Sequence, residues 1–269
     1  NIAGSDTAPT LAPSPARIMA LHDDPGNTRT FTHRTAAPGR ITSPGWDMAH
    51  RKRQNEDMHV DHVIFASGPR GIKADVAHLA GRLGADFREG GFHPGFGTRN
   101  YIIPLADSRY LEVVEVLDHP AAEKVPFGQA VRARSEMGGG WLGWAVSVDD
   151  IAPFEERLER SAVPGSRQIP DGRHLEWRQL GVRGLMADPQ LPVFLQWVSD
   201  TQLRPTSLTS ETRLTEIQIS GSADRLSEWL GLPVTDRLDG VGLNLIAPNG
   251  HPGIAQVTFE SPTKGTVVI

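Results

Sequence analysis

The stretch "GGFHPGFGTRNYIIPLADSRYLEVVEV", residues 90–116, says more about the fold than any other part of the sequence. It opens with four glycines, a proline and a histidine, and it continues into the apolar segment "YIIPL" and the run "RYLEVVEV". Glycine permits positive φ and a close approach of the backbone to another group, whereas proline fixes φ. We therefore expect a bent strand or shaped loop at residues 90–97 that leads into two strands.

The sequence around this stretch predicts a strand, a helix and three further strands. An apolar, β-branched segment at 59–66 predicts the first strand, and apolar residues at helical spacing predict a helix over 72–83. Extended segments follow at about 86–92, 98–106 and 109–117. The last two of these contain the strands that the opening stretch predicts.

The same order recurs twice further along the chain. The second copy has a strand, a capped helix and three extended segments, at 141–148, about 151–158, 166–170, 174–182 and 193–198. The third copy is predicted at 213–220, 223–230, 234–238, 241–247 and 254–260. Repeats of this length determine the architecture, and residues 120–137 between the first two copies predict a partly helical connector.

Residues 1–57 differ from the rest of the chain. They are rich in Pro, Ser, Thr, Ala and Arg, and their apolar residues have neither helical nor strand periodicity. Such a segment buries too little apolar surface to offset its ordering entropy, so we predict a disordered segment. Met58, before "HVDHVIFA", is a possible natural start, and deleting the segment should change the melting temperature by less than ~5 °C.

Composition excludes several classes of function. The chain has 269 residues, is 38% hydrophobic, and has a formal net charge of -5, which gives no electrostatic footprint for nucleic acid. It has 0 cysteines, which excludes disulfides, thiolate metal sites and cysteine nucleophiles. No apolar run approaches the ~20 residues of a membrane span, and no Gly-x-Ser-x-Gly motif indicates a serine hydrolase. We expect a cytoplasmic protein without nucleic-acid or membrane partners.

The repeated unit, with "DHVIFA" and "RYLEVVEV", resembles the vicinal oxygen chelate superfamily, and residues 90–116 are similar to its bacterial glyoxalase-like branch. The resemblance implies an α+β fold of βαβββ units whose curved sheets pair around a cleft, with three copies in this chain. We expect a paired domain at 58–200 and a more divergent third unit at 201–269. The exposed sheet of that third unit must be covered, either within the chain or by a homodimer. We expect the unit to pack on the first two, with homodimerisation left open.

The resemblance also implies a divalent metal (Zn, Ni, Mn or Fe) held by the first and last strands of each unit. In the first unit the matching residues are His62 and Glu112, and His93 from the glycine-rich segment is a candidate third ligand. Strand alternation places His62 on an otherwise apolar face, and it does the same for Glu112. A buried ionised carboxylate is costly unless it is paired or bound to a metal.

The second unit offers fewer ligands. Its matching first-strand position is Gly143 or Trp144, neither of which is a ligand, and its matching fourth-strand residue is Gln196. Two strong ligands are fewer than the three of a typical catalytic zinc.

For the ligand site we expect catalytic roles for Glu112 and Gln196. We expect substrate contacts from four further residues, namely His93, Asn100, Trp144 and Trp197.

Two classes of function remain open. In the first, the protein is a metal-dependent lyase, isomerase or dioxygenase of glyoxalase type that acts on a small oxygenated metabolite. In the second, the same fold binds or sequesters a small molecule without a metal. The pair His62–Glu112 favours the enzyme, and the incomplete ligand set favours the binding protein.

Overall fold

The computed structural model describes residues 58–246 and 251–269. The predicted disordered segment, residues 1–57, lies outside the described residues.

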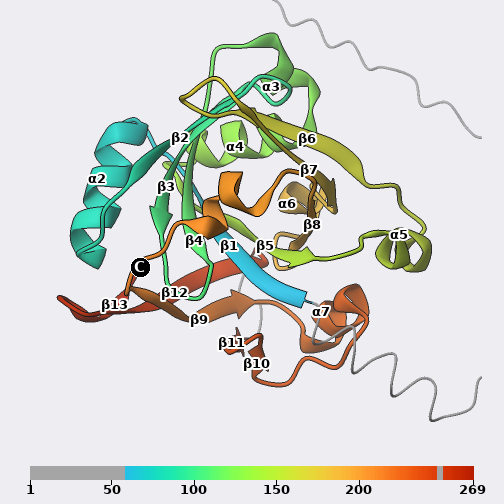
Figure 1. Cartoon of the computed structure of the whole chain (residues 1–269). Coiled ribbons are helices and arrows are strands. Elements are labelled where there is room, and N and C mark those ends of the chain that lie inside the picture. The colour runs from blue at the N-terminus through green and yellow to red at the C-terminus, as the bar shows by residue number, and fades with distance from the viewer. Residues whose placement is uncertain (1–57, 247–250) are drawn as a thin grey trace, which may run out of the picture. The chain divides into compact units, whose positions relative to one another are not determined.

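The first unit has the predicted strand–helix–three-strand order (Figure 1). Its elements are β1 (Met58–Ala66), α2 (Ile72–Leu83), β2 (Arg88–His93), β3 (Thr98–Pro104) and β4 (Tyr110–Val116). The helix buries Ile72, Val76 and Leu83 against the sheet, and it ends at Gly84. Gly84 has φ 61°, a left-handed conformation that glycine adopts without a Cβ penalty.

The second unit repeats this order after a helical connector. The connector forms α3 (Pro120–Lys124) and α4 (Pro126–Glu136), and the unit comprises β5 (Gly140–Val148), α5 (Ala152–Leu158), β6 (Val163–Gln168), β7 (His174–Leu180), a short α6 (Gly184–Ala187) and β8 (Val193–Trp197). Two 3₁₀ turns follow, η1 (Thr201–Leu203) and η2 (Pro205–Ser207).

The eight strands of these two units close into one barrel in the order β1-β4-β3-β2-β6-β7-β8-β5. In each unit the first strand is parallel to the last, with His62 beside Tyr110 in the first and Ala145 beside Val193 in the second. The units meet where β1 runs antiparallel to β5, and there His62 lies opposite Ala145. This register fixes which residues of the two units are equivalent.

The third unit forms a separate sheet, shown in orange to red in Figure 1. Its elements are β9 (Arg213–Ser220), α7 (Ala223–Leu230), β10 (Arg237–Leu238), β11 (Val241–Ile246), β12 (Gly253–Ser261) and β13 (Gly265–Val268). The element order through β12 matches the other units, but the pairing differs. The strand parallel to β9 is β11, whereas β12 lies antiparallel on the other edge of β9 and pairs with β13.

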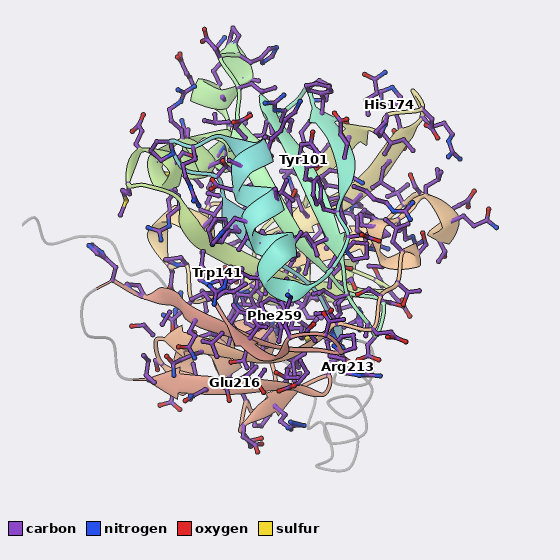
Figure 2. All side chains as sticks on the ribbon, turned by 90° about the vertical axis from the view of Figure 1, so that its left-hand side faces the viewer. Tyr101, Trp141, His174, Arg213, Glu216 and Phe259 are labelled. Carbon is purple, nitrogen blue, oxygen red and sulfur yellow. The ribbon has the colours of Figure 1, made fainter. Side chains whose placement is uncertain are left out.

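The third unit shares one hydrophobic core with the barrel. The ring of Trp229 on α7 stacks on Phe194 of β8 at 5.7 Å, and its indole Nε1 donates to the carbonyl of Pro192. Trp141 and Phe259 lie at the junction between barrel and sheet (Figure 2), where Trp141 Nε1 donates to the carbonyl of Ile269. These contacts join the last unit to the first two through buried side chains.

The predicted fold class, α+β with βαβββ repeats, is confirmed. Within the described part of the chain, no helix is both long and apolar enough to cross a membrane.

Candidate functional site

The barrel encloses a cavity to which every one of its eight strands contributes a side chain. Its polar lining residues are His62, His93, Asn100, Tyr110, Glu112 and Arg167, together with Gln179. About 50 Å³ of it can hold the centres of water molecules, so the space suits a small molecule rather than a polymer.

A change of register in β1 brings two polar residues together. The β1–β5 pairing shifts between Val60 and His62, which leaves Asp61 without a partner on β5. Such a β-bulge re-aims side chains. Asp61 Oδ1 lies 2.8 Å from His62 Nδ1, and the ring of His62 stacks on Tyr110 with centroids 4.4 Å apart. The imidazole is therefore fixed along both its edge and its face.

Asp61 is fully buried and ionised. Burial alone raises the pKa of this carboxyl, but the hydrogen bond and charge of His62, followed by hydrogen bonds from Trp197 and Ser147, outweigh it and hold the pKa below its ordinary value. Trp197 Nε1 donates to Asp61 Oδ2 at 3.0 Å. Because an ionised carboxylate only accepts, His62 Nδ1 is the donor, and the other ring nitrogen of His62, Nε2, is left to face the cavity.

A second buried chain of polar groups lies opposite His62. Glu112 Oε2 is 3.8 Å from His62 Nε2, and Glu112 Oε1 accepts from Asn100 Nδ2 at 2.7 Å. Asn100 Oδ1 in turn accepts from Arg167 Nη1 at 3.3 Å. The structure thus brings together His62, Asn100 and Glu112, as strand alternation predicted.

Gly90 explains part of the glycine-rich stretch. A Cβ there would lie 2.8 Å from Asn100 Cγ and 3.0 Å from Arg167 Nη1, and closer still to Asn100 Oδ1. The Asn100 amide therefore occupies, beside Glu112, the space that a side chain at position 90 would fill.

His93 lines the same cavity as a neutral imidazole. Burial, and then the nearby charge of Arg167, hold its pKa well below the ordinary value. Its Nδ1 lies 2.8 Å from the hydroxyl of Thr98. Aromatic rings surround it at about 6 Å, those of Phe96, Phe127 and Trp177. The predicted position of His93 at the site is therefore found, within an aromatic wall.

The second unit contributes an apolar wall. From the register, Ala145 is equivalent to His62 and Leu195 to Glu112, and both line the cavity. The prediction that Gln196 reaches into the cavity is wrong. Its amide instead donates to the carbonyl of Asp149 at 2.8 Å, next to the start of α5, because alternation along β8 turns Leu195 and Trp197 inward and Gln196 outward.

The two predicted tryptophans have different places. Trp197 lines the cavity, with its indole held by Asp61. Trp144 does not, and its expected substrate contact is a wrong prediction. It is fully buried in the core, and its Nε1 donates to the carbonyl of Gln190 at 3.0 Å.

The residues present do not fit a divalent metal. Across residues 58–246 and 251–269, no group of three or more His, Cys, Asp or Glu side chains could hold a metal ion, so His62, Glu112 and His93 do not form the predicted ligand set. The equivalent positions in the second unit are apolar, and the guanidinium of Arg167 brings a positive charge to the same cavity. A cation would thus have two ligands and a repelling neighbour.

Among the residues of the site that the sequence analysis missed are two charged ones, Asp61 and Arg167. Asp61 directly precedes His62, the predicted metal ligand, and this adjacency was the only sequence feature that indicated its role. Strict strand alternation would turn the Asp61 carboxylate to the face opposite His62. Arg167 lies in "VPGSRQ" on β6, where nothing in the sequence separates it from a surface arginine.

The sequence also matches the family described as glyoxalase-like domain, over residues 60–233. The chain belongs to this family. It is thus a member of the vicinal oxygen chelate superfamily, and the match extends past the barrel through β9 and α7. A comparison with curated proteins found none that matches this glyoxalase-like chain.

Several solved structures are similar to this glyoxalase-like chain. A hypothetical protein from Staphylococcus aureus is 14% identical, with 77% of this chain and 92% of that chain covered at a TM-score of 0.58. Methylmalonyl-CoA epimerase from Mycobacterium tuberculosis is 14% identical, with 54% and 89% covered at a TM-score of 0.36. A hypothetical protein from Bacillus halodurans is 16% identical, with 54% and 96% covered at a TM-score of 0.36.

Proposed function

We propose that this glyoxalase-like protein is an enzyme that moves a proton on a small oxygenated molecule, with His62 as the base and without a metal. The observation that carries the proposal is the pair Asp61–His62, which directs Nε2 of the imidazole toward Glu112 inside the barrel cavity. An imidazole oriented by a buried carboxylate is a common general base.

In the proposed reaction, His62 Nε2 takes a proton from the carbon next to a carbonyl group. The C–H bond breaks, its electron pair forms a C=C bond, and the π pair of the C=O bond moves onto the carbonyl oxygen, while Asp61 stabilises the imidazolium that forms. Glu112 lies 3.8 Å from Nε2, within reach of one substrate oxygen, and can exchange a proton there. In an α-hydroxy carbonyl compound, Glu112 moves the hydroxyl proton to the former carbonyl oxygen, and return of the proton from His62 to the former carbonyl carbon completes an isomerisation.

Proton exchange with solvent tests this proposal directly. The protein in D₂O is mixed with pyruvate, 2-oxobutyrate or hydroxyacetone, and loss of the C–H signal is followed by proton NMR. We expect exchange with at least one of them, and a fall of about 10²-fold or more in the variant His62→Gln.

The control lies on the same strand as Glu112. Glu115→Gln alters a carboxylate that faces the other way, toward Arg99 and the start of α2. Proton exchange should therefore continue in Glu115→Gln and fall in Glu112→Gln. Equal rates in the two variants would contradict the proposed role of Glu112.

A metal assay tests the metal-free part of the proposal. We expect purified protein to lack stoichiometric Zn, Ni, Mn or Fe and to keep its melting temperature in EDTA. One equivalent of metal per chain, lost in His62→Ala, would overturn it.

The second candidate function is binding without chemistry. The aromatic wall of Phe96, Phe127 and Trp177, and the apolar positions Ala145 and Leu195, favour this candidate. Binding of a small-molecule probe, with no proton exchange in pyruvate, 2-oxobutyrate or hydroxyacetone, would favour this binding function over the enzyme.

A further inference from the structure

Arg167 is a buried cation whose hydrogen bonds are incomplete. Its side chain lines the barrel cavity, and the residue is only 5% exposed. The guanidinium has five N–H donors, and in the described part of the chain it makes one hydrogen bond, from Nη1 to Asn100 Oδ1 at 3.3 Å. Its Nε is buried and has no partner.

The charge of Arg167 is also incompletely matched. Among residues 58–246 and 251–269 no carboxylate forms an ion pair with it, and the carboxylate that acts on its charge, Glu112, is separated from it by the Asn100 amide. A buried donor without an acceptor costs free energy, as does a buried charge without a partner. Gly90 lets this guanidinium and the Asn100 amide pack directly against the backbone, because a Cβ there would approach Nη1 at 3.0 Å. The arrangement is thus prepared for an acceptor that the described residues do not supply.

We propose that Arg167 binds a carboxylate of the substrate, so that the molecule that enters the cavity is a small carboxylic acid. The proposal rests on the proposed function only in taking the cavity as the substrate site. A carboxylate accepts two parallel N–H bonds from a guanidinium, here from its terminal nitrogens, because Nε is buried away from the cavity. Arg167, Asn100, Glu112 and His62 follow one another across the cavity, so an acid held at Arg167 lies in the same cavity as His62.

A matched pair of probes tests the proposal. Propionate and propionamide have the same shape and differ in charge, and their binding is followed in the full chain by the ¹H–¹⁵N signals of arginine side chains. We expect the Arg167 Nε–H signal to move with propionate, and propionate to bind roughly tenfold or more tightly than propionamide, because bonds to charged groups are stronger than neutral ones.

Two variants and a control complete the test. Arg167→Gln should bind both probes equally, and Arg167→Lys should keep a reduced preference for the acid, since it keeps the charge and loses the bidentate geometry. Arg178→Gln on β7, which loses only a partly exposed pair with Glu155, should keep the full preference. An unchanged preference in Arg167→Gln, or equal binding in the natural protein with an unmoved Arg167 signal, would overturn the proposal.

The result separates the two proposals. Binding of propionate through Arg167 with no proton exchange in any compound would keep the carboxylate site and refute the catalytic role of His62. Exchange in hydroxyacetone but not in either acid, together with equal binding of the two probes, would do the reverse.

Discussion

The imidazole of His62 is oriented by a carboxylate that strand alternation alone would place on the other side of the sheet. The variant Asp61→Asn keeps the shape of that side chain and removes its charge. Because an amide can donate to Nδ1, we expect the proton to move to Nε2, which ¹⁵N NMR of the imidazole detects. Proton exchange should fall by about 10²-fold or more, and the free energy of unfolding by about 1–3 kcal/mol.

An exposed carboxylate provides the comparison. Asp171 lies in the turn before β7 and pairs with Arg173 at the surface, so Asp171→Asn should leave the His62 proton and the exchange rate unchanged. An unaltered tautomer in Asp61→Asn would contradict the orienting role.

Single residues were the least predictable part of the site. His62, Asn100 and Glu112 could be placed because they alternate with apolar neighbours along regular strands. Asp61 escaped because a bulge changes which way a side chain points, and a bulge has no residue signature in this sequence. Arg167 escaped because its burial depends on closure of the barrel through the β2–β6 pairing, a contact between distant segments.

Among the elements, the glycine-rich segment at the end of β2 offers a sharp test. A methyl group at Gly90 would collide with Asn100, so Gly90→Ala should displace the amide from Glu112 and weaken propionate binding about tenfold or more. We expect it to cost roughly 1–3 kcal/mol of stability, as is typical when a packed site is overfilled. Titration with propionate and urea unfolding measure the two effects.

Gly95, five residues along, is the matched control. A Cβ at this position meets nothing within 4 Å, so Gly95→Ala should bind propionate as the natural protein does. Equal losses in both alanine variants would mean that the segment acts through its flexibility rather than through space for Asn100.

Element boundaries followed the sequence closely where periodicity was long. The helix predicted at 72–83 and the strand predicted at 213–220 are found with those bounds. The residues of β8 that face the cavity were predicted wrongly. Gln196 is the polar residue in an apolar run and was expected to face inward, but a shift of one residue exchanges the two faces of a strand. The strand partner of β12 could not be predicted from the sequence either, because β12 could have paired with either edge of β9.

At the scale of the whole molecule, a polar cluster ties the third unit to the barrel. His59 Nδ1 lies 2.6 Å from Asp239 Oδ2, and Arg109 Nη2 lies 2.7 Å from the same oxygen. Burial lowers the pKa of His59, but the hydrogen bond and charge of Asp239 outweigh it and raise the pKa above 6.5. The folded protein therefore holds this proton more tightly than the unfolded chain does.

This raised pKa makes the contribution of His59 to the free energy of unfolding depend on pH. The contribution of His59 is fully present below about pH 6.5 and is lost as the pH rises through the higher folded-state pKa. We expect His59→Gln to flatten the decline in the free energy of unfolding between about pH 6 and pH 8, measured in urea. His78→Gln on α2, at an exposed position, should keep the slope, and an equal slope in His59→Gln would refute the link.

The shared core predicts that the barrel depends on the third unit. A fragment of residues 58–212 would expose the face of Phe194 on which Trp229 stacks, so we expect it to aggregate or to unfold without cooperativity. In the full chain, Trp229→Ala should cost about 3–5 kcal/mol. Cooperative thermal unfolding of a soluble fragment would contradict this dependence.

The register that sets His62 opposite Ala145, and makes Leu195 the counterpart of Glu112, has an evolutionary consequence. When a unit is duplicated, only one copy must keep the reactive groups, and the other is free to drift toward whatever shape its ligand needs. Here the first copy places His62 and Glu112 in the cavity, whereas the equivalent residues of the second copy, Ala145 and Leu195, are apolar. New specificities in such a chain can therefore arise by changes in β5, β7 and β8 that leave the chemistry of β1 and β4 untouched.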